Sequence, residues 1–245
     1  MNQINTAMIL AAGLGSRLKP WTDHHPKALA VVNGKSLLQR NIEYLQTHGI
    51  TNIVINVHHF AEQIISAVNE NNGWGSVVTI SDETTEVLET GGGLLKAKDL
   101  LFKSENFVLL NCDILTNLNI TAMLQYHLQH NALATLAIAQ RNTSRYLLVN
   151  NSNQIIGWRN VKTNEEKLPA ILKATDNITP YAFSGIHIIN HNIFDTITFT
   201  GKFSMIDLYL SICASQNIIG YNHTNDIVLD VGKPEAIAKA EVLFK

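Results

Sequence analysis

The first half of the chain alternates short apolar runs with longer helical patterns. Runs rich in β-branched residues occupy positions 6–10, 52–57, 76–80 and 107–110, and each has the length and composition of a buried strand. Amphipathic patterns such as 36–48 separate them. Such alternation requires crossover connections, which place parallel strands in one sheet and cover both faces with helices. The sequence therefore predicts an α/β fold with a mostly parallel central sheet flanked by helices.

Capping residues define the ends of the predicted helices. Ser36 can accept a hydrogen bond at the start of the first helix, and Gly49 stands at its expected stop. Asn119 can cap a later helix that runs to about residue 130. Two further helices are predicted over residues 60–70 and 92–102.

The pattern changes after about residue 133, where strands are predicted over 133–139, 146–149 and 154–158. Residues 159–180 are polar and predict a long surface loop, and loops beyond about 12–15 residues are usually functional or disordered. We therefore expect one domain with an accessory β region in its second half. The remaining expected elements are a strand over 181–189 and helices over 204–216 and 234–244.

Composition excludes several classes of function. A formal net charge of -2 gives no electrostatic basis for binding nucleic acid or an anionic membrane. No segment approaches the roughly 20 apolar residues of a membrane span, and the N-terminus lacks a signal-peptide pattern. Two distant cysteines, Cys112 and Cys213, are typical of a reducing compartment. These features predict a cytoplasmic protein, and they assign no oligomeric state.

A glycine-rich segment leaves the first predicted strand. Gly13 and Gly15 remove side chains where the backbone could approach an anion, at the carboxyl end of a parallel strand. The P-loop pattern is missing, and the dinucleotide pattern GxGxxG has Leu18 at its third glycine. Arg17 offers a planar fork for phosphate oxygens, and Lys27 follows a proline that fixes where it emerges. The segment is thus a candidate phosphate clamp.

The stretch LAAGLGSRLKPWTDHHPK, Leu10–Lys27, closely resembles the N-terminal motif LAAGxGxRLxPxTxxxPK of the sugar-1-phosphate nucleotidyltransferases. That resemblance implies a Rossmann-like fold of the nucleotide-diphospho-sugar transferase type. It implies a single nucleotidyltransferase domain over 1–245, with a nucleotide-binding half over about 1–132 and a sugar-binding half over about 133–245. The similarity continues through GKSLL (34–38), LETGGG (88–93), NCD (111–113), FSGI (183–186) and LDVG (229–232).

The resemblance also implies the reaction and its partners. A sugar 1-phosphate attacks the α-phosphorus of a nucleoside triphosphate (NTP), and pyrophosphate leaves. Arg17 and Lys27 would bind the phosphates, while Asp113 and Asp230 would hold Mg²⁺. The strand patterns agree, because Asp113 and Asp230 each follow an apolar run and would lie at the sheet's carboxyl edge. No general base is required, since a phosphate oxygen is already ionised at neutral pH.

Two further sets of residues follow from the same resemblance. The second glycine cluster opens a predicted helix, with Thr90 as a candidate cap, and in the family this loop lies against the nucleobase. Gly185 lies within a predicted strand, which suggests that a ligand approaches the backbone closely there. In the family, the ligand at this position is the sugar. The implied nucleotide-binding residues are Leu10, Ala11, Ala12, Gly13, Gly15, Ser16, Thr90, Gly91 and Gly92, and the implied sugar-binding residues are Asn111, Ser184 and Gly185.

The substrates are less constrained than the reaction. The short chain, with LETGGG and DVG, most resembles N-acetylmuramate 1-phosphate uridylyltransferases of cell-wall recycling. Mannose-1-phosphate guanylyltransferase-like proteins share much of the pattern, and a thymidylyl- or cytidylyltransferase is a third enzyme option. A non-catalytic nucleotide-binding regulatory subunit is also considered, although it would be expected to lose one of the four charged residues. The family's Glu-Lys-Pro motif is incomplete here, because Glu166-Lys167 lacks the proline, so these two residues are assigned at most a weak sugar-side role.

Overall fold

Parallel strands form the centre of the fold. In a computed structural model that describes residues 4–169 and 177–245, β1 pairs in parallel with β4 on one side and with β6 on the other, and β5 lies beyond β4. The direction of winding therefore reverses at β1. Crevices at such switch points are where open α/β sheets bind ligands. The four strands are β1 (Thr6–Leu10), β4 (Asn52–Val57), β5 (Val77–Asp82) and β6 (Asn106–Asn111).

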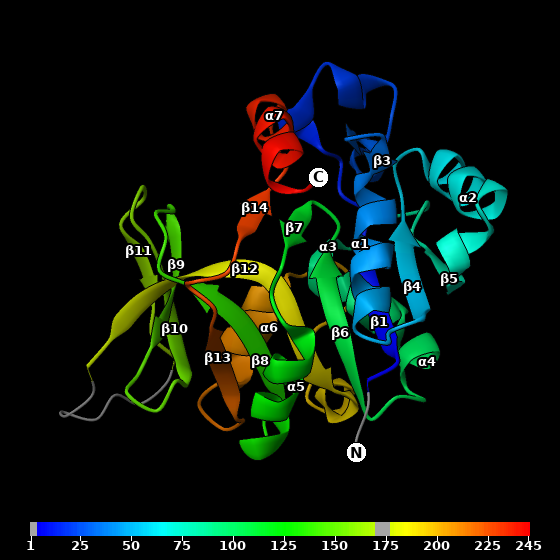
Figure 1. Ribbon diagram of the computed structural model, residues 1–245. Helices are drawn as coiled ribbons and strands as arrows, with labels where there is room; N and C mark the ends of the chain where they lie inside the picture. Colours follow the sequence, from blue (N-terminus) through cyan, green and yellow to red (C-terminus); the bar gives the residue numbers. More distant parts are fainter. Residues whose placement is uncertain (1–3, 170–176) are drawn as a thin grey trace.

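Helices cover both faces of this sheet, as the alternation predicts (Figure 1). Successive side chains of β1 enter opposite cores, since Ala7 and Ile9 belong to one cluster and Met8 to the other. Each fully buried aliphatic side chain contributes about 1.5–3 kcal/mol. The first core is covered by α1 (Leu37–Thr47), α2 (Ala61–Glu70), α5 (Ile120–Gln129) and α7 (Pro234–Leu243), and the second by α3 (Glu89–Lys96), α4 (Lys98–Leu101) and α6 (Met205–Ile212).

The helix caps predicted at Ser36, Asn119 and Gly49 are confirmed. Ser36 Oγ accepts a hydrogen bond from Gln39 N at 3.1 Å, and Asn119 Oδ1 accepts one from Ala122 N at 3.0 Å. Gly49 has a φ of 76°, a left-handed conformation that ends α1 at low cost for glycine.

Antiparallel strands extend the same sheet in the second half of the chain. β12 is antiparallel to β6, β8 is antiparallel to β12, and β13 is parallel to β8. β9, β10 and β11 form an extension on one side of the molecule (Figure 1, left). The expected accessory β region is therefore confirmed. These strands are β8 (Ala134–Ala139), β9 (Arg145–Val149), β10 (Ile155–Asn160), β11 (Glu165–Lys167), β12 (Thr179–Asn190) and β13 (Ile218–Asn222).

Three sequence predictions of secondary structure are corrected. Residues 159–180 are not one loop: β10 continues to Asn160, β11 pairs with it, and β12 begins at Thr179, while 170–176 lie outside the described residues. The side chains of β11 are all exposed, so this charged strand lacks the alternation that reveals half-buried strands. The helix predicted over 92–102 is two helices, α3 and α4, and the one over 204–216 ends at Ile212.

Two small two-stranded sheets complete the architecture. β7 (Ile114–Thr116) and β14 (Val228–Asp230) pair antiparallel, as do β2 (Val31–Val32) and β3 (Lys35–Ser36). Asn33, in the turn between β2 and β3, donates to the carbonyl of Glu241 in α7 at 2.8 Å. Among the described residues, every helix is too short or too polar to cross a membrane.

Candidate active site

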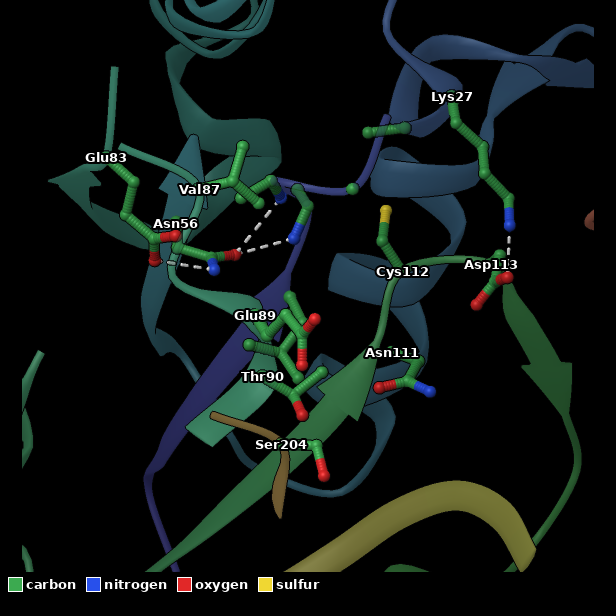
Figure 2. Close-up of a pocket in the computed structure, with 15 residues that line it drawn as sticks. Lys27, Asn56, Glu83, Val87, Glu89, Thr90, Asn111, Cys112, Asp113 and Ser204 are labelled. Carbon is green, nitrogen blue, oxygen red and sulfur yellow. Dashed lines mark hydrogen bonds and ion pairs between the residues drawn. The ribbon is translucent and has the colours of Figure 1, made fainter. Parts of the chain in front are cut away.

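A cavity of about 370 Å³ opens at the carboxyl ends of the parallel strands (Figure 2). Its walls are the ends of β1, β4 and β6, the segment after β5, and the start of α3. Figure 2 shows Glu83 and Val87 at one end of the cavity and Lys27 and Asp113 at the other. The cavity is thus elongated, with a carboxamide and a carboxyl at one end and an ion pair at the other.

The glycine-rich loop forms part of this wall. Leu10, Ala11, Ala12 and Gly13 line the cavity. Gly15 lies beyond them with a φ of 63°, and a Cβ there would lie 2.9 Å from Thr22 Cγ2 and 3.0 Å from Lys27 Cβ. Glycine at this position therefore lets the loop pack against the segment that carries Lys27. Short 3₁₀ helices at Ser16–Leu18, Trp21–Asp23 and Lys27–Leu29 connect the loop to that segment.

Four charged side chains meet at the mouth of the cavity. Lys27 Nζ forms an ion pair with Asp113 Oδ2. Arg17 Nη2 lies 3.3 Å from Asp230 Oδ2 and 3.8 Å from Asp113 Oδ2. The two-stranded sheet of β7 and β14 holds the two aspartates together, and next to it Val231 N donates to Asp113 O at 2.8 Å. The structure therefore brings together the four residues predicted as catalytic and metal-binding.

Gly232 explains how Arg17 can approach Asp230 so closely. A Cβ at Gly232 would lie 2.5 Å from both Arg17 Nη2 and Asp230 Oδ1. Any larger residue would push the guanidinium away from the carboxylate. The glycine of the DVG segment thus leaves room for the Arg17–Asp230 ion pair, and a Cβ there would make these side-chain ends shift.

The second glycine cluster has a different arrangement from the predicted one. Thr90 lines the cavity but does not cap its own helix, which begins after Leu88; its hydroxyl instead accepts a hydrogen bond from Met205 N at 2.9 Å. Gly91 and Gly92 lie buried behind it, and their N–H groups donate to Phe203 O at 2.9 and 3.2 Å. Of these three residues, Thr90 alone reaches the cavity wall, while Gly91 and Gly92 allow α3 to pack against the 201–203 segment.

The predicted sugar-binding residues lie on two adjacent strands. Asn111 ends β6 and lines the cavity. Gly185 in β12 has a φ of 75°, and a Cβ there would lie 2.9 Å from Asn111 Nδ2. Ser184 faces away: its side chain is fully buried, with Oγ 2.8 Å from His223 Nε2. Burial lowers the pKa of His223. Asn111 and Gly185 are therefore together, whereas the Ser184 hydroxyl is directed into the protein.

Sequence reasoning did not identify two buried polar residues of the cavity. Asn56 Oδ1 accepts hydrogen bonds from Ala11 N at 2.7 Å and Ala12 N at 3.3 Å, and Asn56 Nδ2 donates to Glu83 Oε1 at 2.8 Å. Burial raises the pKa of Glu83, and the hydrogen bond from Asn56 partly opposes that rise. Both residues stand near the carboxyl ends of predicted parallel strands, a position that faces the ligand crevice but is also typical of an ordinary strand end.

Sequence reasoning also missed Arg141, an exposed residue outside the cavity wall that lies next to two predicted sugar-binding residues. Arg141 Nη2 donates to Phe183 O at 2.7 Å, next to Ser184 and Gly185. Burial lowers the pKa of Arg141, and the nearby carboxylate of Asp230 opposes that shift. Its position after a predicted strand gave no specific indication of this placement.

The fold is α/β, and the candidate site lies in the crevice at the switch point of its parallel sheet, where such folds bind ligands. The sequence model of the nucleotidyl transferase family matches residues 6–244, and the chain belongs to that family.

Named relatives are similar over nearly the whole chain. The N-acetylmuramate alpha-1-phosphate uridylyltransferase of Caulobacter vibrioides is 29% identical over 243 residues, covering 96% of this chain and 95% of the relative. The protein of the same name from Neisseria meningitidis serogroup B is 29% identical over 239 residues, covering 97% of each. A mannose-1-phosphate guanyltransferase of Yarrowia lipolytica is 24% identical over 97% of this chain, which spans 63% of that relative.

Solved structures share the fold. HddC from Yersinia pseudotuberculosis, complexed with GMP-PN, superposes with a TM-score of 0.78 at 24% identity, covering 99% of this chain and 100% of that one. A UDP-glucose pyrophosphorylase complexed with UDP-glucose has a TM-score of 0.77 at 17% identity, covering 99% and 98%. These similarities confirm the predicted fold class.

Proposed function

We propose that the protein transfers a uridylyl group from UTP to N-acetylmuramate 1-phosphate, giving the UDP-sugar and pyrophosphate, in the cytoplasmic recycling of cell-wall sugars. The observation that carries this proposal is the meeting of Arg17, Lys27, Asp113 and Asp230 at the mouth of the cavity. The choice of substrates is supported by the two full-length relatives of that name at 29% identity.

The chain's cations suit a reaction between two anions. Arg17 is exposed and offers a planar fork to phosphate oxygens, while Lys27 is a more buried point charge. Lys27 is neutralised by Asp113 in this structure, and an arriving phosphate would give it an alternative anionic partner. A phosphate oxygen of the sugar 1-phosphate would attack the α-phosphorus in line. The bond from that phosphorus to the bridging oxygen of pyrophosphate breaks, so positioning and charge neutralisation carry the catalysis.

Asp113 and Asp230 fit the proposed Mg²⁺. Both offer carboxylate oxygens within 4 Å of the same Arg17 nitrogen, and Mg²⁺ is usually held by one or two carboxylates together with water and substrate phosphates. Over residues 4–169 and 177–245 no group of three or more His, Cys, Asp or Glu side chains could hold a metal ion, so water and substrate phosphates would complete the coordination by this pair. A bound Mg²⁺ would supply neutralisation of the developing phosphate charge.

The two ends of the cavity suggest how the substrates are arranged. We assign the nucleotide to the end formed by Ala11, Ala12, Gly13 and Thr90, and the sugar to the side formed by Asn111 and Gly185. The phosphates would then lie at the end of the cavity away from Glu83, next to Lys27 and Asp113.

A second candidate is transfer from GTP to mannose 1-phosphate. The similarity to the mannose-1-phosphate guanyltransferase of Yarrowia lipolytica over 97% of the chain favours it. A non-catalytic nucleotide-binding role is a third, and it is less compatible with the presence of all four charged residues.

One assay separates these candidates. Purified protein is mixed with Mg²⁺ and one NTP, drawn from UTP, GTP, dTTP and CTP, together with one of the 1-phosphates of N-acetylmuramate, mannose, glucose or N-acetylglucosamine, and pyrophosphate release is measured. We expect the highest kcat/KM for UTP with N-acetylmuramate 1-phosphate, and loss of turnover with a chelator.

Each outcome of the assay has a defined meaning. A maximum for GTP with mannose 1-phosphate would replace the proposed substrates but keep the reaction. Absence of pyrophosphate in every combination, with NTP binding retained in calorimetry, would favour the non-catalytic role.

A further inference from the structure

The proposed reaction leaves two buried polar side chains of the cavity unexplained. Asn56 and Glu83 are 2% and 1% exposed, and both line the cavity. Figure 2 shows them side by side at the end away from Lys27, with the Asn56 carboxamide directed at the backbone after β1.

Asn56 holds the first two peptide groups of the glycine-rich loop. β1 and β4 are parallel with Leu10 opposite Asn56, so both strands end at the same level. The Asn56 side chain there accepts hydrogen bonds from the N–H groups of Ala11 and Ala12. It therefore replaces the sheet hydrogen bonding that stops at Leu10, and fixes the direction in which the loop leaves the strand.

Glu83 fixes the orientation of the Asn56 carboxamide. An asparagine side chain has one accepting and one donating end. Glu83 Oε1 accepts from Asn56 Nδ2 at 2.8 Å, which leaves Oδ1 directed at Ala11 and Ala12. Rotating the carboxamide by half a turn would oppose donors to donors and acceptors to acceptors. The carboxyl of Glu83 thus acts on the loop through Asn56.

Helix α3 closes over this pair. A Cβ at Gly93 would lie 2.6 Å from Glu83 Oε1 and 2.9 Å from Asn56 Nδ2, so a side chain there would displace them. Glu83 Oε2 is buried, with no hydrogen-bond partner among the described residues. The pair therefore joins the ends of β1, β4 and β5 to the helix that carries Thr90.

We propose that Asn56 and Glu83 are positioning residues for the nucleotide, which hold the Ala11–Ala12 backbone and so set the path of the loop that carries Arg17. This inference rests on the proposed function for its kinetic readout. The pair lies away from Asn111 and Gly185, so its disruption should affect the nucleotide and spare the sugar phosphate.

The test reverses the polarity of the hydrogen bond between the two side chains. Asn56→Asp opposes two carboxyl groups, whereas Asn56→Asp combined with Glu83→Gln restores a donor–acceptor pair and keeps a single negative charge. The aspartate in the double variant can still accept from Ala11 and Ala12. We expect the KM for the NTP to rise about 10-fold or more in Asn56→Asp and to return to within about 3-fold of wild type in the double variant. The KM for the sugar 1-phosphate should change less than about 2-fold in both.

A matched control comes from the amino-terminal ends of the parallel strands. Asn106, at the start of β6, is 7% exposed and accepts from Asn190 Nδ2 at 3.1 Å. Asn106→Asp is the same substitution in a similarly buried network, and we expect it to leave the KM for the NTP unchanged even if it lowers the melting temperature. Calorimetric titration with NTP alone repeats the comparison without turnover, and remains informative if Asn56→Asp folds poorly, because the double variant is compared with wild type.

Several results would overturn the inference. These are a wild-type KM for the NTP in Asn56→Asp, a double variant no better than the single one, or equal increases in both KM values. Failure of the proposed function is distinguishable, since wild-type protein would then release no pyrophosphate while its NTP affinity could still be compared with that of the variants.

Discussion

At the scale of single residues, the charges of the candidate site neutralise one another before any substrate binds. Two cations, Arg17 and Lys27, lie against two carboxylates, Asp113 and Asp230. Lys27 and Asp113 are the more buried pair, with side chains 16% and 17% exposed. Leaving either charge alone there would be costly, because partly buried ions need a partner. The pairing explains how a site for two polyanions can be stable without them.

Removing one carboxylate charge should lower catalysis, and it should also cost some stability because Lys27 loses its partner. We predict that Asp113→Asn lowers kcat by about 100-fold or more, because charge stabilisation at the reacting phosphate is usually worth that much. It should also raise the Mg²⁺ concentration needed for half-maximal activity, and pyrophosphate release across a Mg²⁺ titration measures both.

The control for this variant is Asp99→Asn, which changes an exposed aspartate of α4. Its kcat and Mg²⁺ requirement should match wild type. Wild-type kcat in a folded Asp113→Asn protein would contradict the assignment of Asp113 to the metal.

The residues that could be predicted from sequence are those within long motifs. Arg17, Lys27, Asp113 and Asp230 belong to such motifs, and the structure brings them together. Asn56 could not be found in the same way, since a polar residue at the end of an apolar run is also typical of a strand end. Its role depends on the register between β1 and β4, which is a property of the folded sheet.

At the scale of elements, the glycine cluster of α3 serves packing as much as ligand approach. Gly91 and Gly92 contact the 201–203 segment, where a Cβ would overlap Phe203 and the carbonyl of Gly201. Their N–H groups are satisfied by Phe203 O. The helix start and the segment before α6 therefore form one unit, which Thr90 completes by accepting from Met205 N.

This packing predicts that replacing a glycine of α3 with alanine destabilises the protein, contrary to the usual effect of helix propensity. Glycine to alanine normally stabilises a helix interior by about 1 kcal/mol. We predict that Gly92→Ala instead lowers the free energy of unfolding by about 1–3 kcal/mol, because the methyl group overpacks against the carbonyl of Gly201. Urea unfolding measures the change.

Lys96→Ala, at the exposed end of the same helix, is the matched control and should alter stability by less than about 0.5 kcal/mol. A stabilised Gly92→Ala protein would show that α3 and the 201–203 segment move apart freely.

Most of the strands missed from sequence are short or charged, although the five-residue, uncharged β13 (Ile218–Asn222) was missed as well. β7, β11 and β14 have three residues each, which is too few for periodicity to register. Their positions depend on pairing with distant segments, as when Asp230 of β14 meets Ile114 of β7. The longer helices and parallel strands were predicted because their periodic patterns and caps are local properties.

At the scale of the whole molecule, the central sheet lies between the two hydrophobic cores, and both halves of the chain contribute strands to it. Strand–helix alternation predicts the parallel part, since crossovers leave few other arrangements. The antiparallel addition of β12 to β6 could not be predicted, because strand direction in the second half depends on long-range pairing. One consequence of this packing is that two histidines, His127 and His187, are each 2% exposed.

These histidines should make the fold sensitive to acid. Burial lowers the pKa of His127 from 6.5 to about 4 and that of His187 to about 3. Below pH 6.5 the unfolded chain therefore binds protons that the folded chain excludes, and stability falls as the pH falls toward 4. Each histidine should contribute a slope of about 1.4 kcal/mol per pH unit in this window. His127→Gln and His187→Gln keep a polar partner for their neighbours without titrating, so urea unfolding from about pH 7 to about pH 4 should show a shallower slope in each.

The exposed His24→Gln is the control and should retain the wild-type slope, whereas equal slopes in all four proteins would contradict the burial of neutral histidines.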